Sequence, residues 1–199
     1  MTDKRKIGEM GISIMTGQIM SRIAAKADIG EEVVDQRRVI IPKAINEDGS
    51  ISVEAMPVED LKIVPDENKM TKNGDIVIKL STPYDAAMID VDTEGCVVPS
   101  FCAIVRNNGS VSNNYLLAFL NSKVCKKQLT DQVAGQAMTI LSVGKIKNVV
   151  IPVPSIEKQR EIGEAFLKSR NKINMIKRIM ELEAKRNDAL IEEIIKEAK

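Results

Sequence analysis

The segment from residue 156 to the C-terminus constrains the fold of this chain more than any other. Its 44 residues contain no proline and a single glycine, Gly163, and they are dense in Glu, Lys, Arg, Ile and Ala. This composition predicts one uninterrupted helix, which Ser155 is placed to cap. At about 1.5 Å per residue such a helix is about 65 Å long. A domain of this size cannot cover that length, so another surface has to bury part of the helix.

Apolar residues recur along this helix at alternating steps of four and three, which predicts a coiled coil. A second apolar set that includes Ile179 and Ile191 broadens the face, so a third or fourth helix could join. Asn187 lies on the seam and is expected to fix the register. A solvated helix that lies along its own domain is the alternative. The residues expected to contact a dimer mate or partner are Ile162, Phe166, Ile173, Ile176, Met180, Asn187, Leu190 and Ile194.

Residues 1–155 have a different pattern, with short β-branched runs separated by Gly, Asn, Asp and Pro. One helix is predicted from Ser112 or Asn113 to about Leu129. The fold class is therefore predicted as α+β, with a mixed-sheet domain over residues 1–155 and one long C-terminal coiled-coil helix over residues 156–199. The predicted strands are Val39–Ile41, Leu61–Val64, Ile76–Leu80, Cys96–Val98, Ala103–Val105 and Val149–Val153.

Several classes of chemistry are excluded by residues that the chain lacks. It contains no histidine, which removes Ser-His-Asp and Cys-His catalysis and any histidine-bearing zinc site. Its three cysteines have no CxxC spacing, and no phosphate-binding glycine loop or GxGxxG is present. Asp90 to Gly95 begins like a calcium loop, but Phe101 stands where the bidentate Glu is needed. We therefore expect no catalytic residue, no metal and no cofactor in this chain.

No apolar run is long enough for a membrane span, and the cysteine usage fits a reducing cytoplasm. The net charge is +1 for the chain, and residues 1–155 hold 18 basic against 19 acidic residues, a difference of −1. Because phosphate contacts dominate DNA affinity, this balance argues against strong DNA binding by the domain alone.

Three polar loops remain as candidate recognition elements: Gly17-Gln18 with Arg22, Ser81 to Tyr84, and Gly135 to Thr139. Their side-chain types suit base edges, since Gln pairs with adenine and Arg with guanine. Ordinary surface loops are the alternative. The candidate DNA-binding residues are Gln18, Arg22, Lys43, Lys79, Thr82, Tyr84, Gln136 and Thr139.

The order of several motifs resembles the specificity subunit of type I restriction-modification systems, in a half-length form with one target-recognition domain. The most specific pieces are two: Gly135 to Val143, and the junction Val149 to Gln159, which contains Ile151-Pro152-Val153-Pro154-Ser155. The likeness covers roughly Lys6 to Phe166, although many members carry a Trp near the start and this sequence has none. Supporting pieces are Lys6 to Glu9, Asn73 to Val77 and Tyr115 to Ser122.

This resemblance implies a non-catalytic subunit that reads double-stranded DNA and directs adenine methylation and restriction by partner subunits. S-adenosylmethionine would then belong to the modification (methyltransferase) subunits and ATP to a restriction or motor subunit. A single recognition domain with a single helix implies a homodimer that reads a split palindrome. Two alternatives stay open: a non-DNA coiled-coil adaptor with a protein-binding globular cap, and a silent cassette kept for recombination.

Overall fold

Strand β5 (Ile76–Lys79) lies inside a four-stranded antiparallel sheet and is covered on both faces. Its neighbours are β7 (Cys102–Arg106) and β6 (Ala86–Met88), and β2 (Ser13–Thr16) pairs with the other side of β7. The run Ile76-Val77-Ile78 is fully buried, so apolar side chains are needed on both faces of the strand.

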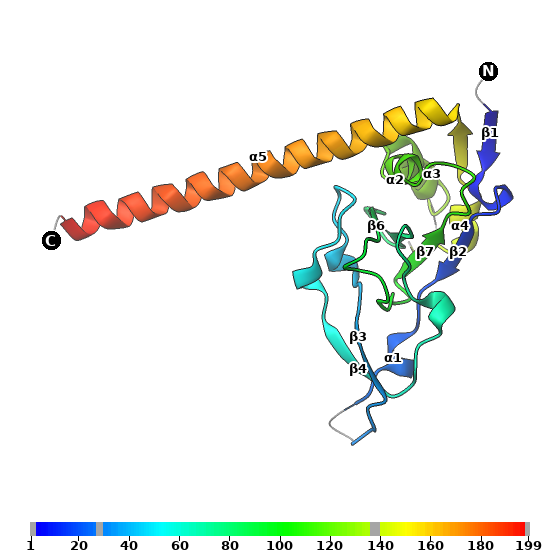
Figure 1. The fold of residues 1–199 in the computed structure, drawn as a ribbon, viewed down its shortest axis with the longest axis horizontal. Helices are drawn as coiled ribbons and strands as arrows, with labels where there is room; N and C mark the ends of the chain where they lie inside the picture. Colours follow the sequence, from blue (N-terminus) through cyan, green and yellow to red (C-terminus); the bar gives the residue numbers. More distant parts are fainter. Residues whose placement is uncertain (1–2, 27–29, 136–139, 198–199) are drawn as a thin grey trace.

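A computed structural model describes residues 3–26, 30–135 and 140–197. In this structure the sheet, its loops and its short helices form one end of the molecule, and a single helix, α5, extends away from it (Figure 1). The predicted α+β class with a long C-terminal helix is confirmed.

Two further strand pairs flank the main sheet. β1 (Asp3–Lys6) pairs with β8 (Val150–Val153), and β3 (Asp35–Arg38) pairs with β4 (Val58–Leu61), both antiparallel. The sequence of β1 is Asp-Lys-Arg-Lys, and all four residues are exposed. It therefore lacks the apolar and polar alternation from which a strand is predicted. The β1–β8 pair brings the start of the chain next to the segment that leads into α5.

Each face of the main sheet has its own apolar core. On one face Ile76 and Ile78 pack with Leu116 of helix α2 (Asn113–Leu120). On the other face Val77 packs with a cluster that includes Ile40. The sheet therefore separates α2 from the segment around residues 40–56.

The helix predicted from residue 112 or 113 to about 129 is two helices, α2 and α3 (Lys123–Asp131), and this corrects the prediction. Helix α2 ends before Asn121, whose side-chain amide is held by Ala86 of β6. Its Oδ1 accepts the N–H of Ala86 at 3.1 Å, and its Nδ2 donates to Ala86 O at 2.8 Å. The Ser122 hydroxyl then accepts the N–H of Cys125 at 3.1 Å and begins α3. The break ties the helical pair to the edge strand β6.

The remaining helices are short. The two α-helical ones are α1 (Met20–Ile23) and α4 (Val143–Lys147). Single 3-10 turns occupy Ile7–Glu9, Pro42–Ala44, Val53–Ala55 and Glu67–Lys69.

Helix α5 (Ile156–Glu197) matches the predicted long helix, and its first turns fix it to the domain. Gln159 is buried and accepts the N–H of Ser112 at 2.8 Å while donating to Pro154 O at 2.9 Å. Gly163 lies where α5 crosses α2, and a Cβ there would come within 2.6 Å of Asn114 Cβ. The only glycine of the helix is therefore required by close packing rather than by a turn.

A turn of the domain touches α5 further along. Gly49 has a φ of +84°, and a Cβ there would press on Leu117 and Phe166 at 3.1 and 3.3 Å. Beyond it, Asn174 donates to Asp48, and Lys177 forms an ion pair with Glu47 at 2.9 Å. We call the turn of residues 46–50 the brace, because it contacts α5 several turns after the helix begins.

The strands around residues 76–80, 103–105 and 149–153 were predicted within a residue or two. The segment 39–41 lies just after β3, and 61–64 overlaps only the end of β4. Around residues 96–98 only isolated bridges form, through Val97. β1, β2 and β6 have no counterpart among the predicted strands.

Candidate nucleic-acid interface

An open cleft of about 470 Å³ lies beside the end of β2 and contains two of the predicted DNA-binding residues, Gln18 and Arg22. We call it the basic cleft. It is lined by Thr16, Gly17, Gln18, Ile19, Arg22, Ile23, Lys69 and Ser100.

The backbone at Gly17 passes close to the facing segment of residues 98 and 99. A Cβ at Gly17 would come within 2.3 Å of the carbonyl oxygens of Val98 and Pro99, so only glycine fits. Gln18 then bridges the facing segment, since its N–H donates to Val98 O at 2.7 Å and its C=O accepts the N–H of Ser100 at 2.8 Å. The same two bonds place Ser100 on the opposite wall.

The side chain of Gln18 is 7% exposed. Its Oε1 accepts the N–H of Asp66 at 3.4 Å, which orients the amide. Its Nε2 is buried and has no hydrogen-bond partner within the described part of the chain. A buried donor of this kind is unfavourable by about 1–3 kcal/mol until an acceptor reaches it.

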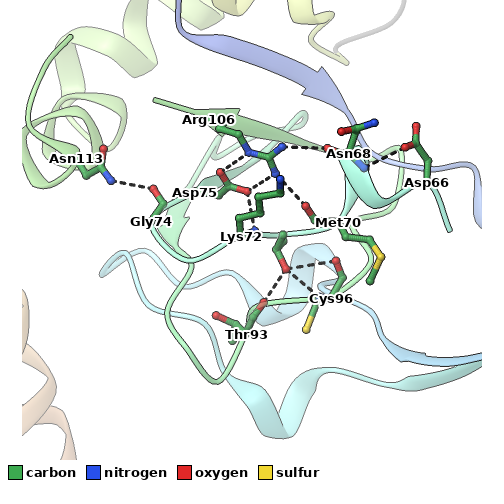
Figure 2. Close-up of polar contacts among 11 residues, drawn as sticks. Asp66, Asn68, Met70, Lys72, Gly74, Asp75, Thr93, Cys96, Arg106 and Asn113 are labelled. Atoms are coloured by element: carbon green, nitrogen blue, oxygen red, sulfur yellow. Dashed lines mark hydrogen bonds and ion pairs between the residues drawn. The ribbon is translucent and has the colours of Figure 1, made fainter. Parts of the chain in front are cut away.

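The loop that carries Lys69 to the cleft is held by Arg106 (Figure 2). The Arg106 guanidinium donates to Asn68 O at 3.2 Å and to Met70 O at 3.0 Å, the carbonyls on either side of Lys69. It also donates two hydrogen bonds to the Asp75 carboxylate, from Nε to Oδ1 at 2.9 Å and from Nη2 to Oδ2 at 2.7 Å. Asp75 is buried, so the charged pair is shielded from water.

Neighbouring contacts complete this support. The Asp66 carboxylate accepts the N–H of Asn68 at 3.0 Å and caps the 3-10 turn. Asp75 also accepts the N–H of Lys72 at 2.8 Å, and Asn113 donates to Gly74 O at 3.0 Å. Figure 2 shows these bonds converging on the segment from Asp66 to Asp75. Lys69 therefore extends from a backbone with little freedom.

Arg22 and Lys69 supply the charge of the cleft. Arg22 is exposed on α1 and Lys69 is partly exposed. Neither side chain has an ion pair or hydrogen bond among the residues that the structure describes. None of the lining residues is acidic.

Lys79 and Tyr84, also predicted to contact DNA, face the interior. Lys79 pairs with Asp85 at 3.0 Å, and the Tyr84 side chain is 1% exposed with no partner for its hydroxyl in the described residues. Lys126 pairs with the other oxygen of Asp85 at 2.6 Å. Burial opposes ionisation of Asp85, but the hydrogen bonds from Lys126 and Lys79 outweigh it and lower its pKa. Lys79 thus joins the loop to β5, and Lys126 joins it to α3.

The other predicted DNA-binding residues are not gathered into this cleft. Lys43 and Thr82 are exposed but do not line it. Gln136 and Thr139 lie outside the described residues. The structure thus brings together Gln18 and Arg22 and adds Lys69 and Ser100, which sequence reasoning missed because both lie far from residue 18 along the chain.

The cysteines show no activation. Burial raises the pKa of Cys96, and it raises the pKa of Cys102 and of Cys125 to about 12. Within the described ranges no cluster of three or more Cys, Asp or Glu side chains could hold a metal ion.

On α5 the predicted partner-facing residues divide into two groups. Phe166 packs against the core of its own domain, and the Arg170 guanidinium lies 5.2 Å from the centre of its ring. Phe166 is therefore partly buried by its own domain. The other seam residues are exposed: Ile162, Ile173, Ile176, Met180, Asn187, Leu190 and Ile194.

Three kinds of comparison with known proteins, by family model, by curated relatives and by solved structures, agree with one another. A family model described as the type I restriction modification DNA specificity domain matches residues 27–184. The type I restriction enzyme MjaVIII specificity subunit of Methanocaldococcus jannaschii is 26% identical over 113 residues, which is 54% of this chain and 26% of that protein.

Two solved structures share the fold. The HsdS subunit from Thermoanaerobacter tengcongensis aligns with a TM-score of 0.65 and 16% identity, over 94% of this chain and 47% of that one. A chain from work on complex assembly and conformational transition of the type I R-M system aligns with a TM-score of 0.63 and 16% identity. The alignment covers 94% of this chain and 45% of that one. This chain therefore spans less than half the length of each of these proteins.

Among the helices described, none is both long and apolar enough to cross a membrane. The family match extends from residue 27 over the rest of the domain and most of α5, well over half of the sequence. On that basis the chain belongs to the family of type I restriction-modification DNA specificity domains.

Proposed function

We propose that this chain recognises a DNA sequence on behalf of partner subunits that methylate and cleave DNA. The observation that carries the proposal is the family match over residues 27–184, which includes most of the domain and most of α5. The inert cysteines and the chain's lack of histidine fit a subunit that performs no bond chemistry itself.

The partners would be modification subunits, which bind S-adenosylmethionine and methylate adenine, and a restriction or motor subunit that uses ATP. Both cofactors then belong to the partners, and the complex works in the cytoplasm. The net charge of −1 over residues 1–155 fits a complex in which the partner subunits make most of the contacts to DNA phosphates.

We further propose that two copies pair through α5. Its exposed seam leaves Ile176, Met180 and Ile194 about half or more exposed to solvent, which is unfavourable for an isolated helix. An antiparallel pair with two-fold symmetry would place identical domains at opposite ends of the paired helices. The target would then be a split palindrome, with a gap set by the helix length and by the angle at which α5 leaves the domain.

Selection from random duplex DNA by the purified complex with its modification subunits tests DNA recognition. Two inverted copies of one short sequence at fixed spacing are expected. Enrichment of no sequence by a folded, assembled complex would overturn DNA recognition and favour the coiled-coil adaptor.

Substitution on the seam tests pairing. Ile176→Glu together with Met180→Glu should change the mass of the purified chain in solution from dimer to monomer, because each buries a charge in the interface. Lys185→Glu places glutamate on the opposite face of the helix and should leave the dimer intact. A seam double variant that stays dimeric, with the helix content of the wild type, would contradict pairing through this face.

A further inference from the structure

We propose that the basic cleft binds one phosphate of the DNA backbone and so fixes the position of the domain on the duplex. This inference rests on the proposed function, since it assigns a task to one site within DNA recognition. It changes the expected role of Arg22 from reading a guanine to holding a phosphate, and it adds Lys69.

The charge of the cleft favours an anion. Arg22 and Lys69 come from different elements, α1 and the 3-10 turn of Glu67–Lys69, yet both line the same opening. The lining contains no carboxylate, and the carboxylate of nearby Asp66 is engaged by the N–H of Asn68 at 3.0 Å. Two unpaired cations at one opening attract a negatively charged group that can accept from both.

The neutral donors of the cleft favour the same kind of ligand. Gln18 lines the cleft with a buried Nε2 that has no acceptor within the described residues. Thr16 and Ser100 add hydroxyl groups to the lining. A phosphate offers acceptors in several directions at once, so it can use hydroxyl, amide and cationic donors that do not share a plane.

The residue types favour a phosphate over a base edge. Reading a base needs a planar, aligned pair of hydrogen bonds, as an arginine fork makes with guanine. Gln18 is only 7% exposed, so its amide cannot enter a groove to meet a base edge. Lys69 is a point charge that needs no planar partner and suits a phosphate. Contacts to phosphates fix the register of a protein on DNA without carrying sequence information.

The rigidity of the loop fits this positioning task. Arg106 holds the carbonyls on both sides of Lys69, and its fork to the buried Asp75 anchors it. Gln18 and Ser100 are joined by a backbone bond of 2.8 Å, so both walls of the cleft are fixed. A phosphate held here would therefore have a defined distance to the recognition loops.

Salt-dependent binding tests the inference. The chain, assembled with its modification subunits, is titrated with a duplex that carries the selected target and with a shuffled duplex, over a series of KCl concentrations. The variants are Arg22→Gln and Lys69→Gln. The matched control is Lys123→Gln, an exposed lysine at the start of α3 that does not line the cleft.

Because both cations contact the same phosphate, each cleft variant should reduce the magnitude of the slope of log affinity against log salt concentration by at most about 0.9, the value for one lost phosphate contact. Each should also weaken binding to both duplexes by the same factor, so the ratio between them is unchanged. The control should keep the wild-type slope.

An unchanged slope in both cleft variants, or a loss confined to the target duplex, would overturn the phosphate site, the second result indicating base reading by Arg22 or Lys69. A wild-type complex that binds both duplexes equally would instead overturn DNA recognition itself.

Discussion

At the scale of single residues, buried polar groups decide which side chains are available for recognition. Residue type alone made Lys79 and Tyr84 good candidates for DNA contact, but Lys79 is paired with Asp85 and Tyr84 is buried. The place of Arg22 near Gln18 could be expected from sequence because only three residues separate the two. The place of Lys69 could not, because it depends on Arg106 and Asp75, which are 37 and 6 residues away in sequence.

Removing the Tyr84 hydroxyl should not destabilise the protein. The hydroxyl has no partner in the described residues, so Tyr84→Phe should leave the free energy of unfolding unchanged or raise it by up to about 1 kcal/mol. Tyr115→Phe is the matched control, because the Tyr115 hydroxyl donates to Pro152 O at 2.5 Å and its loss should cost about 1 kcal/mol. Chemical denaturation measures both. A larger loss for Tyr84→Phe than for Tyr115→Phe would show that the Tyr84 hydroxyl is bonded.

Asp85 should make stability depend on pH in the acid range. Burial raises its pKa, but the hydrogen bonds of Lys126 and Lys79 lower it by more, so the folded state holds the ionised form. A lowered folded pKa stabilises the protein above the unfolded value of about 3.9, and this contribution is lost as pH falls through the folded pKa.

The test compares unfolding free energies between pH 6 and pH 3. Asp85→Asn should be less stable than the wild type at pH 6, and the difference should shrink as the pH falls below about 4. Asp188→Asn, an exposed carboxylate on α5, should run parallel to the wild type. A constant difference between Asp85→Asn and the wild type over the whole range would exclude the ion pairs as its cause.

At the scale of elements, the long helix was predictable and the way it is attached was not. The absence of proline and the heptad spacing can be recognised in the sequence of the helix itself. The crossing with α2 at Gly163 and the contact with the brace depend on residues more than 40 positions away. The same holds for β1, which is charged and exposed and becomes a strand only because β8 lies beside it. The division between α2 and α3 depends on an amide bonded to a distant strand.

The brace should couple energetically to α5. Glu47 and Lys177 are largely exposed, so Glu47→Lys or Lys177→Glu alone should lower the free energy of unfolding by only about 0.5 kcal/mol, through loss of attraction and gain of repulsion. The double swap should recover most of that loss, because it restores an opposite-charge pair. The measurement is a double-mutant cycle at low salt. Additive effects of the two substitutions would mean that the brace does not hold the helix through this pair.

At the scale of the whole molecule, the sequence allowed the fold class, the family and the start of the long helix after residue 155 to be predicted. The order of the motifs indicated the family, and the change from turn-rich to glycine-poor sequence indicated where the long helix begins. The site could be predicted only in part, because the basic cleft is assembled from segments around residues 17, 22, 69 and 100, which fold together through the β2 end and the Arg106 network. No single stretch of sequence contains that arrangement.

The measurement that tests DNA recognition most directly is a map of adenine methylation across the source genome, made in cells that carry this gene and in cells from which it has been deleted. One split palindromic motif should lose methylation on deletion and regain it when the gene is restored, while other methylated motifs stay unchanged. Identical methylation maps with and without the gene, in cells that express the modification subunits, would contradict a working specificity subunit.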